Sequence, residues 1–480
     1  MKKISINYCY LLLFIPLFLL FTIDFQGECD IWFLFSHGRY VLSHGFPHVD
    51  FLSMHEGLHF VMQQWLSSII FYLSYHLLGD IGVYLVVWIT TVFIMFFLFR
   101  LCKIICKDLF LSCILTDIIT IMLEFCFIVC RPGIFSLLAF IILLCIMESY
   151  IKKKSKHIYF LVLLSLIEVN MHASMWPVLF VLLLPYVVHY FLLYIHKKDK
   201  TIFQLLFIIG LMILVGFINP YGWEAMTYSF RSYGVSDIKN LIWEMNGLDL
   251  SSDLVYVRFF GYMQFLLFVS VSYIYIQSKK KVPLYRLLLF YGTCFMGFLN
   301  IRNISLFLIC SIPFCSEYIA LKNTYIKMNY KTFKWEILVC IILLCSFAYY
   351  ERDNFVVVKK DIGQVEVLEY LEKYADKKEP LYTMNSHGGF YSYYGYKTYI
   401  DTRAELFIKK NNHKEDIFHE FYLVMNGKIR YDEFLNKYQF HYLVVDKREP
   451  FYKYLKSDYN TYYHPVYGCK KLIVYERNSE

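Results

Sequence analysis

Long apolar runs recur along the first 350 residues, separated by short polar stretches. A membrane-spanning helix needs about 20 apolar residues, within a range of about 17–25. The pattern predicts eleven transmembrane helices. We expect the first to be uncleaved, because no small-residue cleavage site follows its apolar stretch. The predicted helices cover residues 6–24, 81–101, 109–129, 133–151, 158–170, 173–195, 202–218, 256–277, 284–300, 304–320 and 334–350.

The five basic clusters of the first 350 residues fall on one side of this topology. Lysine and arginine resist translocation and therefore collect in cytoplasmic loops. If the N-terminus is cytoplasmic, the inner loops contain the basic clusters at 100–107, 152–156, 197–200, 279–281 and 322–331. Residues 25–80, 219–255 and 351–480 are then predicted to lie outside the cytoplasm.

The apolar segment 60–78 does not fit as a further span, because it would move every later basic cluster to the outer side. It also carries Gln63, Gln64 and His76. We predict an interfacial helix on the outer leaflet, a depth that suits Trp65. This helix belongs to the outer loop 25–80 of a transmembrane domain formed by residues 1–350.

The composition changes after residue 350. Residues 351–480 carry 21 basic and 20 acidic side chains, and their length suits one small domain. Helical spacing and Tyr- and Val-rich runs predict an α/β domain, with SHGGF at 386–390 as a turn. The predicted helices are 362–374, 413–425 and 430–438, and the predicted strands are 380–384, 396–400, 441–445 and 471–475. The expected fold is an α-helical polytopic membrane protein with a small extracytoplasmic α/β domain.

Composition narrows the class further. Hydrophobic residues make up 58% of the chain and charged residues 18%, whereas soluble domains carry about 25% charged residues. A single soluble globule is therefore excluded. Most of the 14 cysteines lie inside apolar runs and form no CxxC motif, so neither a zinc site nor a redox pair is supported. Five histidines in the loop 27–65 match no metal motif. We expect no cofactor, with a divalent metal as the alternative, and no nucleic-acid partner.

Acidic residues in the first outer loop are candidates for chemistry. Asp30 directly precedes Ile31 and Trp32. Partial desolvation raises the pKa of a carboxyl group, which suits a general base. The alternative is an N-cap for the segment WFLFSHGRYVL. Asp50 could likewise cap residues 51–60 or act as a second acid.

Two arginines lie at the predicted outer ends of helices, where the charge rule disfavours them. Arg131 and Arg302 could together grip a phosphate, because a guanidinium is a permanently charged bidentate donor. The alternatives are lipid headgroup binding or pairing with Glu244. Other polar residues in outer turns are Asn170, His172 and Asn303.

These residues belong to a larger ordered pattern. The segment DIWFLFSHGRYVLSHGFPHVDFLS resembles the first outer loop of bacterial membrane glycosyltransferases of the GT-C superfamily, of the aminoarabinose or mannosyl transferase type. The resemblance continues through RPGIF at 131–135, VNMHAS at 169–174, NPYG at 219–222, RNISLF at 302–307 and HGGFYSYYGYKTYIDTRAELF at 387–407.

The resemblance implies a function in cell-surface glycan assembly at the bacterial plasma membrane. Such enzymes move a sugar from a polyprenyl-phosphate donor to a glycan, lipid or protein acceptor at the outer face of the bilayer. Asp30 matches the acidic residue that acts as the base. Arg131 and Arg302, with His172 as a partner, are the candidates that stabilise the departing phosphate.

This chain departs from the family at three positions. Leu34 stands where relatives often have a histidine, and Gln63 and Gln64 replace a His-Glu pair. If these three positions carry out acid–base catalysis in relatives, this chain has lost that function or moved it to Asp50 or Glu56.

Other interpretations remain open. They are a flippase or polymerase-type protein and a non-catalytic scaffold of polysaccharide assembly. In the C-terminal segment, Asp401 and Arg403 could contact an acceptor or form a structural ion pair.

Overall fold

The computed structural model describes residues 12–20, 29–125, 127–232, 242–248, 251, 255–278, 281–318 and 362–478. The predicted span 334–350 lies outside these residues, and 6–24 is described only over 12–20. The chain divides into two compact units, 1–24, 84–222 and 243–355 in the first and 25–83, 223–242 and 356–480 in the second. By contacts, the first outer loop groups with the C-terminal segment, and the division into domains 1–350 and 351–480 stays a prediction.

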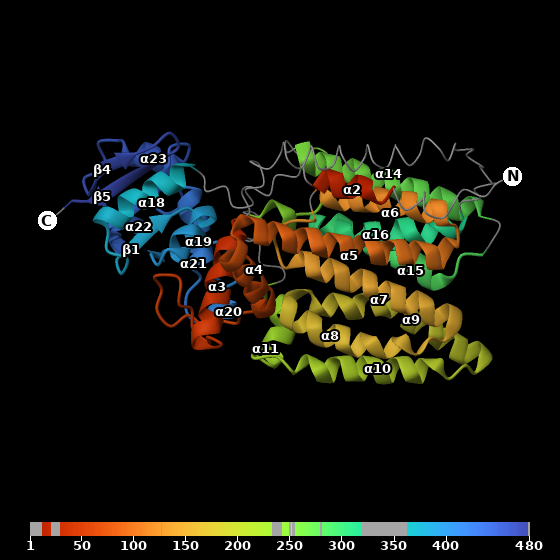
Figure 1. The fold of residues 1–480 in the computed structure, drawn as a ribbon. Coiled ribbons are helices and arrows are strands. Elements are labelled where there is room, and N and C mark those ends of the chain that lie inside the picture. The colour runs from red at the N-terminus through yellow and green to blue at the C-terminus, as the bar shows by residue number, and fades with distance from the viewer. Residues whose placement is uncertain are drawn as a thin grey trace. The chain divides into compact units, whose positions relative to one another are not determined.

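The described part of the first unit is a helical bundle (Figure 1). Its α-helices are α2 (Phe14–Leu19), α5 (Asp80–Cys106), α6 (Leu109–Glu124), α7 (Gly133–Lys153), α8 (Phe160–Met171), α9 (Trp176–Lys197), α10 (Thr201–Gly216), α14 (Val255–Gln277), α15 (Leu284–Leu299) and α16 (Ile304–Cys315). Short 3₁₀ turns are η2 (Lys156–Tyr159), η3 (Ala173–Met175), η4 (Trp243–Met245), η5 (Ile301–Asn303) and η6 (Ser316–Tyr318). Each predicted span that the structure describes, in whole or in part, is helical.

The bundle packs through neighbouring helices along the chain. α7 contacts α8 and α9, and α10 contacts the same two helices. α15 packs on α9 and α16. Local signals fix the helix ends: the Asp108 carboxylate caps α6 by accepting the Leu111 N–H at 2.8 Å.

Four described helices are long and apolar enough to cross a bilayer: Asp80–Cys106, Gly133–Lys153, Ala173–Lys197 and Val257–Gln277. The exposed faces of the bundle are themselves apolar, as the exposed fractions of Phe207 (62%), Leu214 (64%) and Leu266 (64%) show. An exposed apolar face of this size suits lipid rather than water. The chain is a multi-pass membrane protein, while the number of eleven spans stays a prediction.

The second unit contains two outer-loop helices, α3 (Asp30–His44) and α4 (Trp65–Leu78). They pack closely, because a Cβ at Gly38 would collide with the carbonyl oxygen of Ser68. Helix α4 begins at Trp65 rather than at residue 60, so residues 60–64 form the connection that leads into it. Two short helices follow later in the chain, α11 (Trp223–Met226) and α12 (Tyr228–Ser232).

The C-terminal segment forms a five-stranded mixed sheet in the order β2-β1-β3-β5-β4. β1 pairs in parallel with β2 and β3, while β5 pairs antiparallel with β3 and β4. The strands are β1 (Pro380–Thr383), β2 (Lys397–Thr398), β3 (Tyr442–Asp446), β4 (Tyr463–Gly468) and β5 (Leu472–Arg477). The helices are α18 (Ile362–Tyr374), α19 (Asn385–Tyr393), α20 (Lys409–Asn412), α21 (Ile417–Met425), α22 (Tyr431–Tyr438) and α23 (Pro450–Leu455).

The prediction of a turn at SHGGF was wrong, because these residues lie inside α19. The glycines serve close packing instead of chain reversal. A Cβ at Gly388 would collide with the backbone of Ile400, and one at Gly389 would lie 3.5 Å from the Trp32 Cβ atom. α19 therefore packs directly on the start of α3.

Candidate functional site

Two arginines that are far apart in the sequence meet at one carboxylate in the first unit. Arg131 precedes α7 and its Nη1 atom lies 3.1 Å from Glu244 Oε2. Arg302 in η5 reaches the same oxygen through Nε at 3.0 Å. The pairing with Glu244 that the sequence left open is thus present. Two guanidinium groups therefore share one carboxylate.

This arginine cluster is open to solvent. The side chains of Arg131, Glu244 and Arg302 are exposed by 29%, 24% and 37%. Burial alone would raise the pKa of Glu244, but the charges and hydrogen bonds of the two arginines outweigh it and lower the pKa. Glu244 is therefore ionised at neutral pH. It holds the two guanidinium groups in place.

His172 lies near this cluster, at the end of α8. Its Nδ1 atom is 3.0 Å from Ser136 Oγ in α7. Burial and the nearby charge of Arg302 lower the pKa of His172 to about 3. The imidazole is therefore neutral at physiological pH. A neutral ring adds no positive charge and acts through hydrogen bonds, and the role of His172 as a partner of the two arginines stays a prediction.

Two asparagines expected near this region have structural partners. Asn170 Nδ2 donates to the carbonyl oxygens of Leu166 at 2.8 Å and Ile218 at 3.0 Å. Asn303 Nδ2 donates to the Met296 carbonyl oxygen at 3.2 Å. Both amides tie a turn to a helix end. Their contacts support packing roles.

Asp30 is the first residue of α3 and is half-buried. The capping alternative is not what the structure shows, because the N-cap position is Cys29. A carboxylate in the first turn is favoured by the helix dipole. The helix start is fixed by Trp32, whose ring meets Phe390 edge-on at 4.9 Å and Tyr393 at 5.4 Å. Asp30 is thus held on a rigid element of the second unit.

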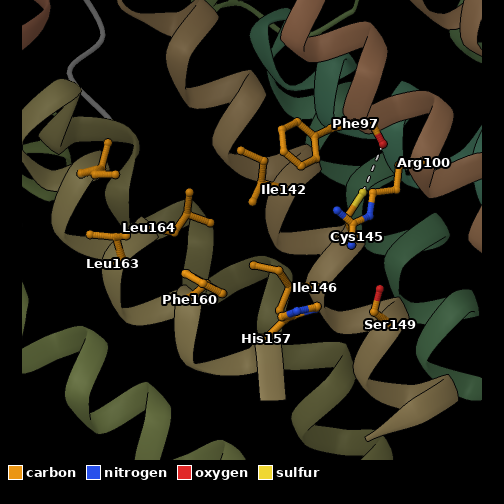
Figure 2. A pocket seen from close by; sticks show the side chains of 11 residues that line it. Phe97, Arg100, Ile142, Cys145, Ile146, Ser149, His157, Phe160, Leu163 and Leu164 are labelled. Atoms are coloured by element: carbon orange, nitrogen blue, oxygen red, sulfur yellow. Dashed lines mark hydrogen bonds between the residues drawn. The ribbon is translucent and has the colours of Figure 1, made fainter. Parts of the chain in front are cut away.

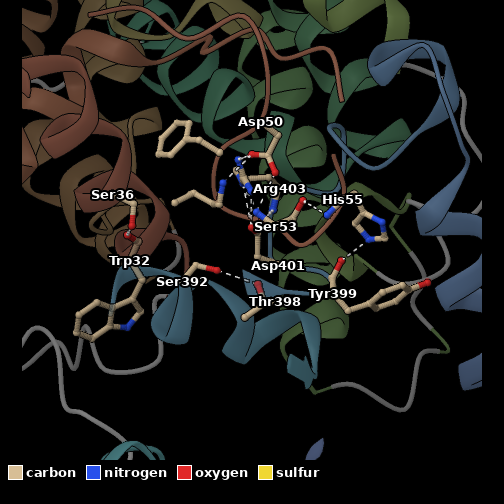
Figure 3. A network of polar contacts seen from close by, with 12 residues as sticks. Trp32, Ser36, Asp50, Ser53, His55, Ser392, Thr398, Tyr399, Asp401 and Arg403 are labelled. Atoms are coloured by element: carbon tan, nitrogen blue, oxygen red, sulfur yellow. Dashed lines mark hydrogen bonds and ion pairs between the residues drawn. The ribbon is translucent and has the colours of Figure 1, made fainter. Parts of the chain in front are cut away.

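Asp50, Asp401 and Arg403 form a closed ion-pair cluster in the same unit (Figure 3). Arg403 Nη1 lies 2.6 Å from Asp50 Oδ1, and Arg403 Nη2 lies 2.6 Å from Asp401 Oδ2. The carboxylates are fully buried and the guanidinium is 6% exposed. The structural ion pair that the sequence offered for Asp401 and Arg403 is present.

The state of Asp50 follows from this environment. Burial alone would raise its pKa, but the charge and hydrogen bonds of Arg403, with bonds from Ser53, hold the pKa at about 2. No helix occupies residues 51–60, so Asp50 caps no helix; it accepts the Ser53 N–H at 2.9 Å. A carboxylate enclosed in this way is a poor proton acceptor, which favours a structural role over that of a second acid.

The remaining loop candidates are dispersed. Glu56 is exposed, and its carbonyl oxygen accepts a hydrogen bond from Lys414 Nζ at 2.8 Å. Gln64 is buried immediately before α4. The loop histidines have separate neighbours: His55 contacts the Tyr399 carbonyl oxygen at 2.8 Å and His59 contacts Glu224 at 3.1 Å. Within the described residues, no group of three or more His, Cys, Asp or Glu side chains could hold a metal ion.

The bundle also contains an apolar cavity of about 350 Å³ between α5, α7 and α8. Figure 2 shows Arg100, Ser149 and His157 among its mostly apolar lining. Ser149 lies near the end of α7, whereas Arg131 precedes its start. An α-helix rises about 1.5 Å per residue, so this cavity and the arginine cluster lie at opposite ends of α7.

Sequence reasoning missed several buried charges inside the apolar runs. Glu168 is 1% exposed, and its Oε1 atom has no hydrogen-bond partner among the described residues. It lies one turn before His172 and faces Ser136. Elsewhere in the bundle, Arg286 pairs with Glu148 at 3.5 Å and with Glu317 at 2.7 Å. An acidic residue within an apolar run is the signal that could have found them.

Comparison with known proteins places the fold. No family model and no curated protein matches the chain. The structure is similar to ArnT from Cupriavidus metallidurans bound to undecaprenyl phosphate, with a TM-score of 0.54, 11% identity and coverage of 98% of both chains. The apo form of that protein matches with a TM-score of 0.54, 10% identity and coverage of 98% of this chain and 97% of the other. An oligosaccharyltransferase from Archaeoglobus fulgidus matches less well, with a TM-score of 0.47, 11% identity, and 93% and 70% coverage.

Proposed function

We propose that this chain, which has the fold of GT-C membrane glycosyltransferases, transfers a sugar from a polyprenyl-phosphate donor to an extracytoplasmic acceptor. The similar ArnT structure was determined with undecaprenyl phosphate bound. A donor of this kind places a phosphate at the membrane surface and a polyprenyl chain in the bilayer. The proposed setting is surface-glycan assembly at a bacterial plasma membrane, with residues 351–480 outside.

The observation that carries the proposal is the arginine cluster. Arg131 and Arg302 come from distant parts of the chain, yet both contact Glu244 and stay partly exposed. An open pair of arginines at a helix terminus in a membrane protein is suited to a phosphate of a lipid. Neutral His172 would add a hydrogen bond to a donor oxygen rather than a charge.

The reaction needs few groups. The acceptor hydroxyl oxygen attacks the anomeric carbon while the bond from that carbon to the phosphate oxygen breaks. Asp30 accepts the hydroxyl proton, and the polyprenyl phosphate leaves with one more negative charge than it had as the ester. Positively charged donors that face the leaving phosphate lower the barrier, because charge develops there in the transition state. The roles of Asp30 and of the arginine cluster are proposed separately, and each has its own test.

The test of the base compares Asp30→Asn with Asp80→Asn in a deletion strain. Asp80 is a matched control because it is the first residue of α5, as Asp30 is of α3. We expect Asp30→Asn to reproduce the glycan defect of the deletion and to accumulate a polyprenyl-phosphate sugar, at unchanged membrane levels of the protein. Asp80→Asn should restore the glycan.

Two results would contradict the proposal. Wild-type glycan in the Asp30→Asn strain would remove the base assignment. A deletion that changes neither the surface glycan nor the pool of polyprenyl-phosphate sugars would remove the glycosyltransferase function itself.

A further inference from the structure

A further cavity, whose lining includes basic side chains, lies within the second unit. It measures about 270 Å³ and is enclosed by α3, residues 51–52 and the segment that joins α19 to β2. Three of its lining side chains are basic or can become so, namely Arg39, His44 and Lys397, and none is acidic. Pockets for drug-sized ligands measure about 300–1,000 Å³, so this cavity suits one sugar unit rather than a long chain.

The two permanent cations of this cavity are fixed in place without being neutralised. Arg39 Nη2 donates to the Tyr393 carbonyl oxygen at 2.8 Å, and the guanidinium lies 4.7 Å from the centre of the Tyr393 ring. Lys397 Nζ donates to the Phe51 carbonyl oxygen at 2.7 Å. Neither side chain has a carboxylate partner in the described part of the chain. Each side chain retains N–H groups that can bind a ligand. The hydrogen bonds to the carbonyl oxygens restrict both side chains and so reduce the conformational entropy lost on binding.

The other polar groups of the wall are largely satisfied by the protein. Ser36 Oγ donates to the Trp32 carbonyl oxygen at 3.1 Å, and Ser392 Oγ lies 2.8 Å from Thr398 Oγ1. Tyr396 differs, since its buried hydroxyl has no partner among the described residues. The permanent charge left in the cavity is therefore that of Arg39 and Lys397.

Aromatic rings shape the cavity without offering a stacking face. The Tyr40 ring is sandwiched between Phe51, at 3.8 Å between centroids, and His44, at 4.7 Å. Asp50, next in sequence to Phe51, is buried and paired with Arg403, so it does not compensate Arg39 or Lys397. Recognition in this cavity must therefore rely on charge and hydrogen bonds rather than on stacking against an apolar sugar face.

We propose that this cavity binds a negatively charged sugar residue of the acceptor, through its carboxylate or phosphate group. The inference rests on the proposed glycosyltransferase function for the identity of the ligand, but the binding itself needs neither donor nor turnover. Arg39 and Lys397 hold the anion. The residue is bound as a recognition element, and none of these side chains takes part in bond making.

The experiment measures binding of glucuronate, glucose 6-phosphate and glucose to the purified full-length chain by saturation-transfer difference NMR. We expect at least one of the two acidic sugars to bind saturably while neutral glucose does not. Arg39→Gln and Lys397→Gln should each weaken that binding about 10-fold, as expected for loss of one charge-assisted hydrogen bond. Lys428→Gln, at an exposed lysine of the same unit, should leave binding unchanged.

Other outcomes would overturn the inference. They are equal binding of glucose, an equal loss in Lys428→Gln, or unchanged binding in both cavity variants. Displacement of the acidic sugars by phosphatidylglycerol in the micelles would show a lipid headgroup site instead.

The Asp30→Asn protein separates this inference from the proposed function. It should bind the acidic sugar as the wild type does while lacking transfer. Loss of transfer in Asp30→Asn without any acidic-sugar binding in the wild type would defeat the cavity inference alone. In an active preparation, Lys397→Gln should raise KM for the acceptor with kcat little changed.

Discussion

The two ion-pair clusters combine guanidinium and carboxylate groups in opposite ratios. The first has two guanidinium groups and one carboxylate, and the second has one guanidinium group and two carboxylates. In the first unit, Arg131 and Arg302 share Glu244 and remain 29% and 37% exposed. In the second unit, Asp50 and Asp401 share Arg403, and all three groups are nearly or fully buried. The open cluster leaves part of both arginine side chains exposed. The hydrogen-bonding groups of the closed cluster are satisfied by one another. Its role is therefore to hold the outer loop against the C-terminal segment.

Both clusters consist of arginines and carboxylates. The difference in their roles therefore comes from solvent exposure and from the ratio of arginines to carboxylates. An exposed ion pair contributes about 0–1 kcal/mol to stability. Removing one partner of a buried pair costs about 3–5 kcal/mol because it leaves an uncompensated charge. The two clusters should therefore respond oppositely to equivalent substitutions in assays of stability and activity.

The largest effect is expected from Arg403→Gln. It leaves Asp50 and Asp401 buried without their cation and should destabilise the second unit by about 3–5 kcal/mol. Denaturant unfolding of the full-length chain in detergent measures this. Arg302→Gln is the control from the open cluster and should change stability by no more than about 1 kcal/mol. Equal losses in the two variants would contradict the distinction between the clusters.

The next effect concerns activity. Arg302→Gln should lower transfer about 100-fold, because removing one preorganised donor from a developing anion typically costs 10²–10³ in rate, roughly 3–4 kcal/mol. The assay uses lipid extracts of the deletion strain as donor source. Arg131→Gln should behave similarly, and Arg430→Gln, at an exposed arginine of the second unit, should retain activity. Full transfer in both cluster variants would exclude the arginines from the phosphate site.

A smaller effect should appear as a dependence of stability on pH. The folded-state pKa of Asp50 is held at about 2, below the unfolded value of about 3.9. The ionised group therefore stabilises the fold above pH 4, and this contribution is lost as the pH falls from about 4 towards 2. The shift corresponds to about 2–3 kcal/mol. Asp50→Asn should have lower stability at pH 6 and a flatter stability profile between pH 5 and 3, and a profile that stays as steep would refute the assignment.

The smallest effect should come from Glu244→Gln. The substitution removes one negative charge from the open cluster, while the amide can still accept a hydrogen bond. Binding of undecaprenyl phosphate should tighten severalfold at low salt, about 1 kcal/mol, and should become more sensitive to salt because the cluster is exposed. Glu379→Gln, at an exposed carboxylate of the second unit, is the control. Weaker binding in Glu244→Gln would mean that Glu244 acts mainly by positioning the arginines.

Much of the architecture could be predicted, because apolar length and helical periodicity are local properties. The predicted helix 362–374 coincides with α18, and the predicted strand 380–384 differs from β1 by one residue. β4 was missed, since its alternation is broken by Pro465 and a bulge. The SHGGF segment was misassigned, because its two glycines allow close packing against residues distant in the sequence and do not form a local turn.

The sequence identified candidate site residues, but it did not show which of them come together in space. The sequence by itself determined the membrane class, most helices, the placement of polar residues at helix ends and the resemblance to GT-C enzymes, because each depends on local composition and order. Only the tertiary structure decided that Glu244 joins Arg131 to Arg302, that Arg403 encloses Asp50, and that Arg39 and Lys397 remain uncompensated. Pairing, burial and residual charge arise from contacts between distant residues, such as Arg403 and Asp50, which are 353 positions apart, and no local pattern encodes which charge will meet which.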